Sequence, residues 1–102
     1  MPRKNEKCIM PPSQMYATER RPGLHRHEVF FGTGNRQKSI DLGLVVFLTP
    51  EMHNMGNQGV HFNKIFDLQL KKIGQRAAMD EYGWSVEDFI KEFGRNYLEV
   101  EI

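Results

Sequence analysis

The sequence has almost no cysteine, no long apolar run and almost no net charge. Cys8 is the one cysteine in 102 residues, which excludes an internal disulfide framework and a zinc site made of cysteines alone. No stretch approaches the ~20 apolar residues of a membrane-spanning helix, and no apolar run follows the N-terminus as in a secretory signal. We therefore expect an intracellular, cytoplasmic protein.

Charge is balanced overall but unevenly placed. Lys and Arg total 14 against 13 Asp and Glu, a net charge of +1, which excludes a uniformly basic nucleic-acid coat. Residues 1–27 hold six basic and two acidic groups, and residues 80–102 hold seven acidic and two basic groups. This gradient either orients the protein on a polyanion or is simply an uneven solvated surface. The length suits a single domain.

The first half of the chain predicts two strands joined by a loop. Residues 1–23 are expected to be an irregular basic segment, because prolines and glycine interrupt any period. The single domain then covers residues 24–102. Residues 24–31 are predicted to be a strand, residues 32–39 a loop rich in turn formers, and residues 44–48 a buried β-branched and aromatic strand.

A short helix is predicted after the second strand. Thr49 suits the N-cap, Pro50 the first helical position and Glu51 the positive end of the helix. This helix carries His53, and glycines break it near Asn57.

Two further helices are predicted in the C-terminal half, which makes the fold class α+β. The first covers residues 62–81 and ends at Gly83, and Ser85 then caps the second, with Asp88 completing an approximate capping box and Gly94 ending it. The apolar face of the first helix comprises Phe62, Phe66, Leu70, Ile73 and Ala77, widened by Ile65 and Leu68. The buried face of the second comprises Val86, Phe89, Ile90 and Phe93.

Four histidines lie outside these amphipathic faces: His25, His27, His53 and His61. His25 and His27 share one face of the first strand, because side chains alternate along a strand. The order strand–loop–strand–helix is expected to bring the end of the first strand beside the start of the short helix, where His53 lies. Clustered imidazoles suit a divalent transition metal. A lone histidine is more often a surface or hydrogen-bonded group, so both interpretations stay open.

Other polar residues near these histidines are candidates with two interpretations each. Glu28 either reaches the site and deprotonates a water, or is a strand residue paired with Arg26 or Lys38. Asn35 either holds the loop in shape or is a simple turn residue. Arg26, Arg36 and Lys38 either contact nucleic-acid phosphates or are ordinary solvated charges.

Several blocks of the sequence occur in a familiar order. They are His-Glu-Val-Phe-Phe-Gly, Gly-Asn-Arg-Gln-Lys-Ser, Gly-Leu-Val-Val-Phe-Leu-Thr-Pro, His-Asn-Met, Gly-Val-His-Phe-Asn and Phe-Gly-Arg-Asn-Tyr-Leu. Over residues 27–98 the chain resembles small phage and prophage proteins of the HNH, or ββα-metal, nuclease superfamily. The resemblance implies an HNH-like core of a β-hairpin and a short helix, followed by two helices. It also implies one divalent ion (Mg, Mn, Ni or Zn) and hydrolysis of phosphodiester bonds in nucleic acid, DNA rather than RNA, in a bacterial host cell.

The resemblance also implies roles for individual residues. His27 takes the first metal-ligand position and His53 the helix ligand, while Asn57 lies four residues on at the third ligand position and His61 is its substitute. Asn35 takes the position of the loop asparagine that constrains the base.

Two departures from the family pattern matter. Glu28 stands where a histidine base is usual, and its ordinary pKa near 4.3 makes it a weak base at neutral pH, so His25 or His27 is the alternative base. Relatives carry cysteine pairs that hold a structural zinc, whereas only Cys8 remains here. The domain is then either less stable or a homodimer.

Three functions follow from these features. The first is a metal-dependent HNH endonuclease. The second is a catalytically silent HNH-like module that binds nucleic acid or a protein, such as a phage packaging or recombination protein. The third is a protein-interaction module without metal.

Overall fold

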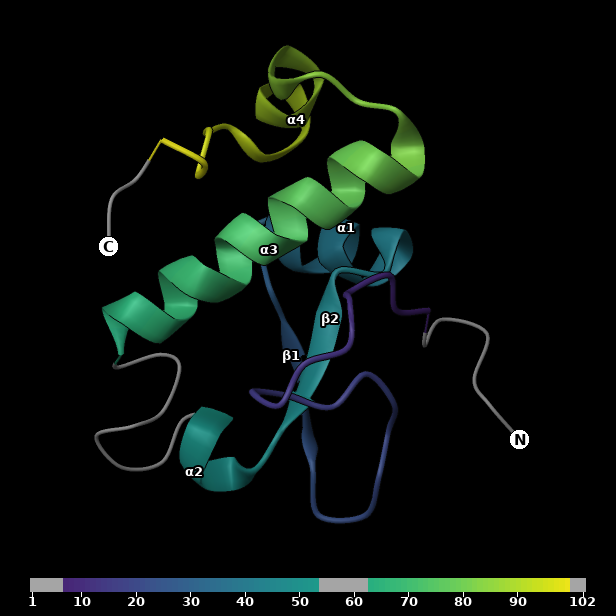
Figure 1. The fold of residues 1–102 in the computed structure, drawn as a ribbon, viewed down its shortest axis with the longest axis vertical. Coiled ribbons are helices and arrows are strands. Elements are labelled where there is room, and N and C mark those ends of the chain that lie inside the picture. The colour runs from purple at the N-terminus through teal and green to yellow at the C-terminus, as the bar shows by residue number, and fades with distance from the viewer. Residues whose placement is uncertain (1–6, 54–62, 100–102) are drawn as a thin grey trace.

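The computed structural model describes residues 7–53 and 63–99. These residues form a small α+β fold with a two-stranded antiparallel sheet and four helices. In chain order the elements are β1 (His25–Glu28), α1 (Asn35–Leu42), β2 (Val45–Leu48), α2 (Pro50–His53), α3 (Lys64–Tyr82) and α4 (Val86–Phe93). In Figure 1, α2 and α4 lie at opposite ends of the molecule and α3 runs obliquely between them. None of the helices within the described ranges is long and apolar enough to cross a membrane.

The two strands pair with His25 opposite Leu48 and Glu28 opposite Val45. β1 ends at Glu28, three residues before the predicted end. The reason is that the Phe30 backbone bonds to a side chain instead of continuing the ladder: its N–H donates to Ser39 Oγ at 3.1 Å and its C=O accepts from the same hydroxyl at 2.7 Å.

The predicted loop over residues 32–39 is wrong, because α1 occupies most of it. This helix has no apolar stripe that would reveal it in the sequence. It is held instead by the fully buried Ser39 and its two hydrogen bonds to Phe30. The turn formers mark only its ends: Gly34 precedes it, and Gly43 ends it with a left-handed φ of 82°.

The segment before β1 packs against β2. Ala17 forms an antiparallel bridge to Phe47, and the Ile9 N–H donates to the Gly43 carbonyl at 2.8 Å. All four residues of β2 are consequently buried. The Cys8 thiol donates to the Val45 carbonyl at 3.1 Å, and burial raises its pKa, which suits an unreactive cysteine.

The ends of the C-terminal helices are where the sequence predicts them. Gly83 ends α3 in a left-handed conformation, and Ser85 and Asp88 form a full capping box at the start of α4. The start of α3 is two residues later than predicted, because the Asn63 side chain accepts from the Phe66 N–H at 3.1 Å.

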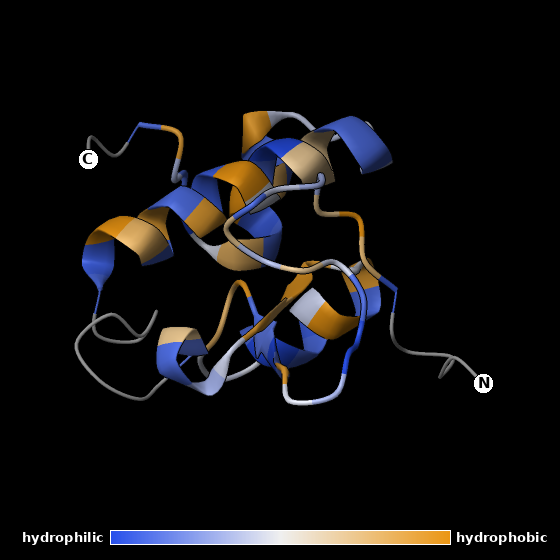
Figure 2. Ribbon diagram, turned by 60° about the horizontal axis from the view of Figure 1, so that its bottom comes forward, coloured by the Kyte–Doolittle hydropathy of each residue, from blue (hydrophilic) through white to orange (hydrophobic). Residues whose placement is uncertain are grey.

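The apolar face of α3 differs from the predicted one. Ile65 is 59% exposed, whereas Gly74 and Gln75 are fully buried. A Cβ at Gly74 would lie 3.1 Å from both Val29 and Phe30, so glycine allows the helix to approach the end of β1 closely. Figure 2 shows the resulting alternation of hydrophobic and hydrophilic bands along α3.

Aromatic rings fill the core between the sheet and the C-terminal helices. Phe30 lies with its ring centroid 5.3 Å from Phe89 and 4.5 Å from Phe93. Phe89 and Phe93 supply the buried side of α4, while Ile90 is partly exposed rather than buried as predicted.

Candidate functional site

β1 presents different chemistry on its two faces. His25 and His27 project to one face and Arg26 and Glu28 to the other, as the alternation of a strand requires. His25 is exposed at the start of the strand, whereas His27 is only 1% exposed.

α2 brings a third imidazole to the histidine face. The Thr49 hydroxyl accepts from the Met52 N–H at 3.2 Å and its carbonyl accepts from the His53 N–H at 2.9 Å, which fixes the single turn of this helix. The ring centroid of His53 lies 5.5 Å from that of His25 and 5.2 Å from that of His27. The structure therefore brings these three histidines together.

The route by which they meet differs from the predicted one. The start of β1 lies beside α2, not its end, because an antiparallel partner places His25 opposite Leu48 at the end of β2. His25 is consequently closer to the helix than the sequence predicts. His25 Nδ1 and His53 Nδ1 lie 3.4 Å apart in a hydrogen bond, and the tautomers of the two rings decide which nitrogen donates.

This separation fits two ligands of one metal ion. Two imidazole nitrogens bound to a tetrahedral ion at about 2.0–2.1 Å lie about 3.3–3.4 Å apart. Imidazole favours Zn, Ni, Cu or Fe over Mg, which prefers oxygen ligands. Residues 7–53 and 63–99 contain no group of three or more His, Cys, Asp or Glu that could hold a metal ion, so within these residues His25 and His53 are the two nitrogens spaced as ligands of one ion. Asn57 and His61 lie outside the described residues.

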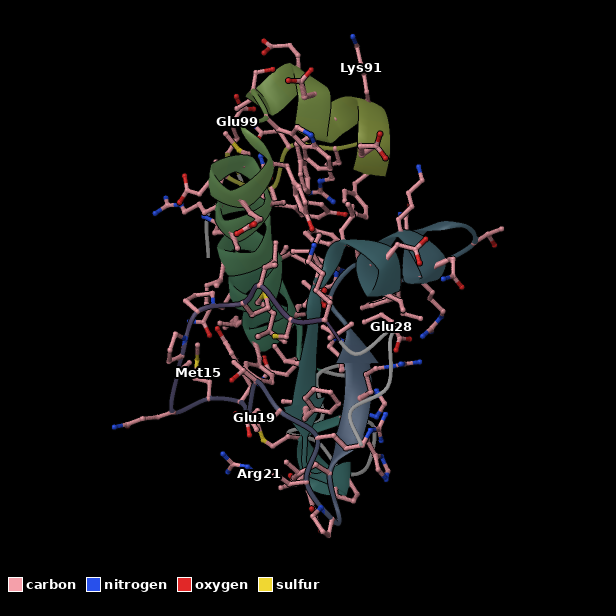
Figure 3. The ribbon with its side chains drawn as sticks, turned by 90° about the vertical axis from the view of Figure 1, so that its right-hand side faces the viewer. Met15, Glu19, Arg21, Glu28, Lys91 and Glu99 are labelled. Carbon is pink, nitrogen blue, oxygen red and sulfur yellow. The ribbon has the colours of Figure 1, made fainter. Side chains whose placement is uncertain are left out.

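Glu28 is held on the opposite face of β1. Its Oε2 accepts from Arg26 Nε at 3.3 Å, and its Oε1 accepts from a terminal nitrogen of Arg36 at 2.9 Å. Figure 3 shows Glu28 at the end of β1, beside α1. Both carboxylate oxygens are thus occupied by guanidinium groups, as the pairing interpretation expects for Arg26.

Asn35 and Lys38 are placed by α1. Asn35 is the first residue of this helix rather than a loop residue, and its N–H donates to the Gly32 carbonyl at 3.2 Å. Lys38 Nζ donates to the Glu92 carbonyl at 2.6 Å and so ties α1 to the end of α4, not to Glu28. Among the three basic candidates, the Arg36 side chain is the most open to solvent, at 54% exposed.

Three residues that were not among the predicted site residues connect to His27, one directly and two through it. The Phe31 ring lies 5.7 Å from that of His27, and Lys71 Nζ lies 4.1 Å from the centroid of the Phe31 ring. Lys71 also donates to Asp67 at 2.8 Å. The i,i+4 spacing of Asp67 and Lys71 is a signal of this pair in the sequence, but nothing local relates the pair to Phe31.

A hollow that no histidine lines lies elsewhere in the described residues. It measures about 820 Å³ and is bounded by the segment before β1, the end of β2 and the start of α3. Its wall is largely apolar, with Met15, Met52 and Ile65 among its members, and no histidine lines it. The imidazole cluster is separate from this hollow, and within it His25 is exposed while His27 is buried.

Comparison with protein-family models, with curated proteins and with solved structures finds no match to this chain. The chemistry of the site accordingly rests on the geometry of its own residues.

Proposed function

We propose that the protein is a metal-dependent endonuclease of the HNH type, which hydrolyses phosphodiester bonds of nucleic acid. One observation carries this proposal: His25 Nδ1 and His53 Nδ1 lie 3.4 Å apart, as two ligands of a single ion do. An antiparallel strand pair followed by one helical turn presents them, which is the ββα order that the sequence resemblance implies.

The histidines take distinct roles in this proposal. His25 and His53 hold the ion, so His25 is a ligand rather than the base. His27 is too buried to meet substrate, and it packs its ring against His53 and Phe31, which restricts how the His53 ring turns. A bound transition-metal ion would polarise the scissile phosphate and make the attacking water more acidic.

Glu28 serves binding rather than proton transfer. Both Glu28 oxygens already accept hydrogen bonds from arginines, so neither is positioned to take a proton from a water. Glu28 instead orients Arg26 and Arg36, and these two cations contact phosphates that flank the cleaved bond.

Nicking of supercoiled plasmid tests the proposal. The protein is assayed without added metal and with Mg, Mn, Ni or Zn, beside His53→Ala and the matched control Glu51→Gln, an exposed neighbour on α2. We expect nicking with the imidazole-preferring ions, at least about 100-fold slower in His53→Ala and unchanged in Glu51→Gln. Nicking without metal, or full nicking by His53→Ala, contradicts the proposal.

A catalytically silent HNH-like binding module is the second candidate. The two ion pairs of Glu28 favour this second candidate, because Glu28 stands at the family's base position and both of its oxygens are bound to arginines. This candidate predicts a folded protein that binds metal and nucleic acid and nicks under no condition.

A further inference from the structure

Cations and aromatic rings alternate in a connected run, and one of its rings, Phe31, lies 5.7 Å from the ring of His27. We call this run of Arg36, Phe31, Lys71, Tyr97 and Arg95 the cation–aromatic ladder. The Arg36 guanidinium lies 5.8 Å from the Phe31 centroid, and Lys71 Nζ lies 4.1 Å from Phe31 and 5.7 Å from Tyr97. The Arg95 guanidinium lies 5.2 Å from the Tyr97 centroid. Four separate parts of the chain contribute members, so the ladder is a product of the fold.

The members of the ladder differ in what they offer to solvent. The Lys71 side chain is only 12% exposed and is paired with Asp67, so it acts as a spacer between the two rings. Arg36 and Arg95 are exposed, and the Phe31 and Tyr97 rings are half-buried. The two arginines at the ends of the ladder carry its charge at the solvent side, and Arg36 is also paired with Glu28.

A buried amide fixes the distal part of the ladder. Gln75, fully buried in α3, accepts from the Tyr97 N–H at 2.8 Å and donates to Asn96 Oδ1 at 2.8 Å. The segment after α4 is thereby attached to α3, and the Tyr97 ring is held beside Lys71. Two rings in fixed positions lose little conformational freedom when a ligand stacks on them.

This arrangement suits an unpaired nucleic-acid strand. Proteins bind single strands by stacking bases on aromatic side chains while cations track the phosphates, whereas the bases of a duplex are already stacked on each other. We infer that the cation–aromatic ladder is a track for single-stranded nucleic acid that leads a strand toward His25 and His53. The inference deepens the proposed nuclease function and rests on it for the destination of the strand.

The ladder also has a purely structural interpretation, in which its contacts only attach the C-terminal segment to α3. The two interpretations differ in what conservative variants do. If the ladder binds nucleic acid, binding needs an aromatic ring at position 31 and a positive charge at position 95. If the ladder only attaches the C-terminal segment, folded variants at these positions bind nucleic acid no differently from wild type.

Fluorescence anisotropy of labelled oligonucleotides on the full chain tests the track. The probes are dT and rU oligomers of about 10 nucleotides and a DNA duplex of the same length, all with a chelator present. Variants are Phe31→Leu with Phe31→Tyr as its conservative partner, and Arg95→Gln with Arg76→Gln as a matched loss of an exposed cation elsewhere on the surface. Circular dichroism confirms that each variant is folded.

If the ladder is a single-strand track, the protein binds a single strand more tightly than the duplex. A preference for dT or for rU then shows whether the bound strand is DNA or RNA. Phe31→Leu should weaken this binding about 5- to 100-fold, and Phe31→Tyr should retain it. Arg95→Gln should lower the salt dependence by about 0.7 in slope, and Arg76→Gln should not. Absence of binding, equal binding of the duplex, or wild-type binding by folded Phe31→Leu and Arg95→Gln overturns the track. Because no metal is present, these results are independent of whether the protein nicks plasmid.

Discussion

The side chains of His25 and His27 project from one face of β1, and those of Arg26 and Glu28 project from the other. The four-residue strand therefore separates imidazoles from ion pairs. On the second face the charges satisfy one another, because Glu28 accepts from Arg26 and Arg36. On the first face the imidazole of His25 contacts that of His53 from α2, nitrogen to nitrogen. Both oxygens of Glu28 are in ion pairs, whereas His25 and His53 contact each other through one nitrogen apiece, and we propose that a metal ion binds at that contact.

The two faces of β1 differ in which atoms can still bind a ligand. A neutral imidazole carries one nitrogen lone pair that can bind a transition metal, while both oxygens of Glu28 accept from guanidinium groups. We therefore expect substitutions on the two faces to change different steps of the reaction.

Replacing His25 should have the largest effect. His25→Ala removes one of the two proposed ligands, and we expect metal affinity and metal-dependent nicking to fall at least about 100-fold, since even residues that only support a ligand contribute about 10- to 100-fold. Metal titration and plasmid nicking measure the two quantities.

The neighbouring variant Arg26→Gln is the control for the opposite face, and it should leave metal affinity unchanged. Normal metal affinity in His25→Ala, together with a displaced pH–rate profile, would make His25 the base instead.

Loosening α1, the helix that carries Arg36, should lower the stability of the fold. Ser39→Ala leaves the Phe30 N–H and C=O without their partner in the core, and we expect the free energy of unfolding to drop by about 1–3 kcal/mol. Urea denaturation measures the change. Ser13→Ala, which removes a hydroxyl bonded at the surface, is the matched control. Equal stability of the two variants would show that Ser39 does not hold α1.

Neutralising Glu28 separates orientation from catalysis. Glu28→Gln should change the maximal nicking rate by less than about fivefold, because partly exposed ion pairs contribute at most about 1 kcal/mol. A general base would contribute about 10²- to 10⁴-fold. Asp41→Asn removes the same charge from the exposed side of α1 and serves as the control. A loss in the larger range would return the base role to Glu28.

The smallest effect is expected far from both faces, in the capping box of α4. The backbone N–H of Ser85 donates to the Asp88 carboxylate at 3.0 Å and lowers its pKa. The charged form therefore stabilises the fold above its ordinary pKa of about 3.9, and this contribution is lost as the pH falls through the lowered pKa. Asp88→Asn should melt below wild type at neutral pH, by a difference that narrows in acid, with nicking unchanged.

Melting temperatures between about pH 7 and pH 3 check this sign. Glu87→Gln in the same helical turn is the control. A difference that stays constant across the range would mean that the cap does not act through the charge of Asp88.

The ends of the C-terminal helices were predictable because they are decided locally. Gly83 and Gly94 adopt left-handed conformations, and Ser85 caps through its own side chain, so each signal acts within one turn. The short helix that carries His53 follows from Thr49 and Pro50 in the same way.

The remaining features depend on partners distant in the sequence. α1 was missed because Ser39 stabilises it through Phe30, across a turn that reads as a loop. The close approach of His25 to His53 depends on strand register, and no residue near either histidine specifies that register. The cation–aromatic ladder likewise joins Phe31 to Lys71 and Tyr97 only after α3 and the C-terminal segment have packed.

Calorimetric titration of Zn²⁺ into the full chain, with His25→Ala and His53→Ala beside wild type, shows whether these two histidines hold a metal ion. We expect one ion per chain and a loss of binding in each single variant, because both nitrogens belong to the same site. Absence of binding by the wild-type protein, or unchanged binding by either variant, would contradict a metal held between β1 and α2.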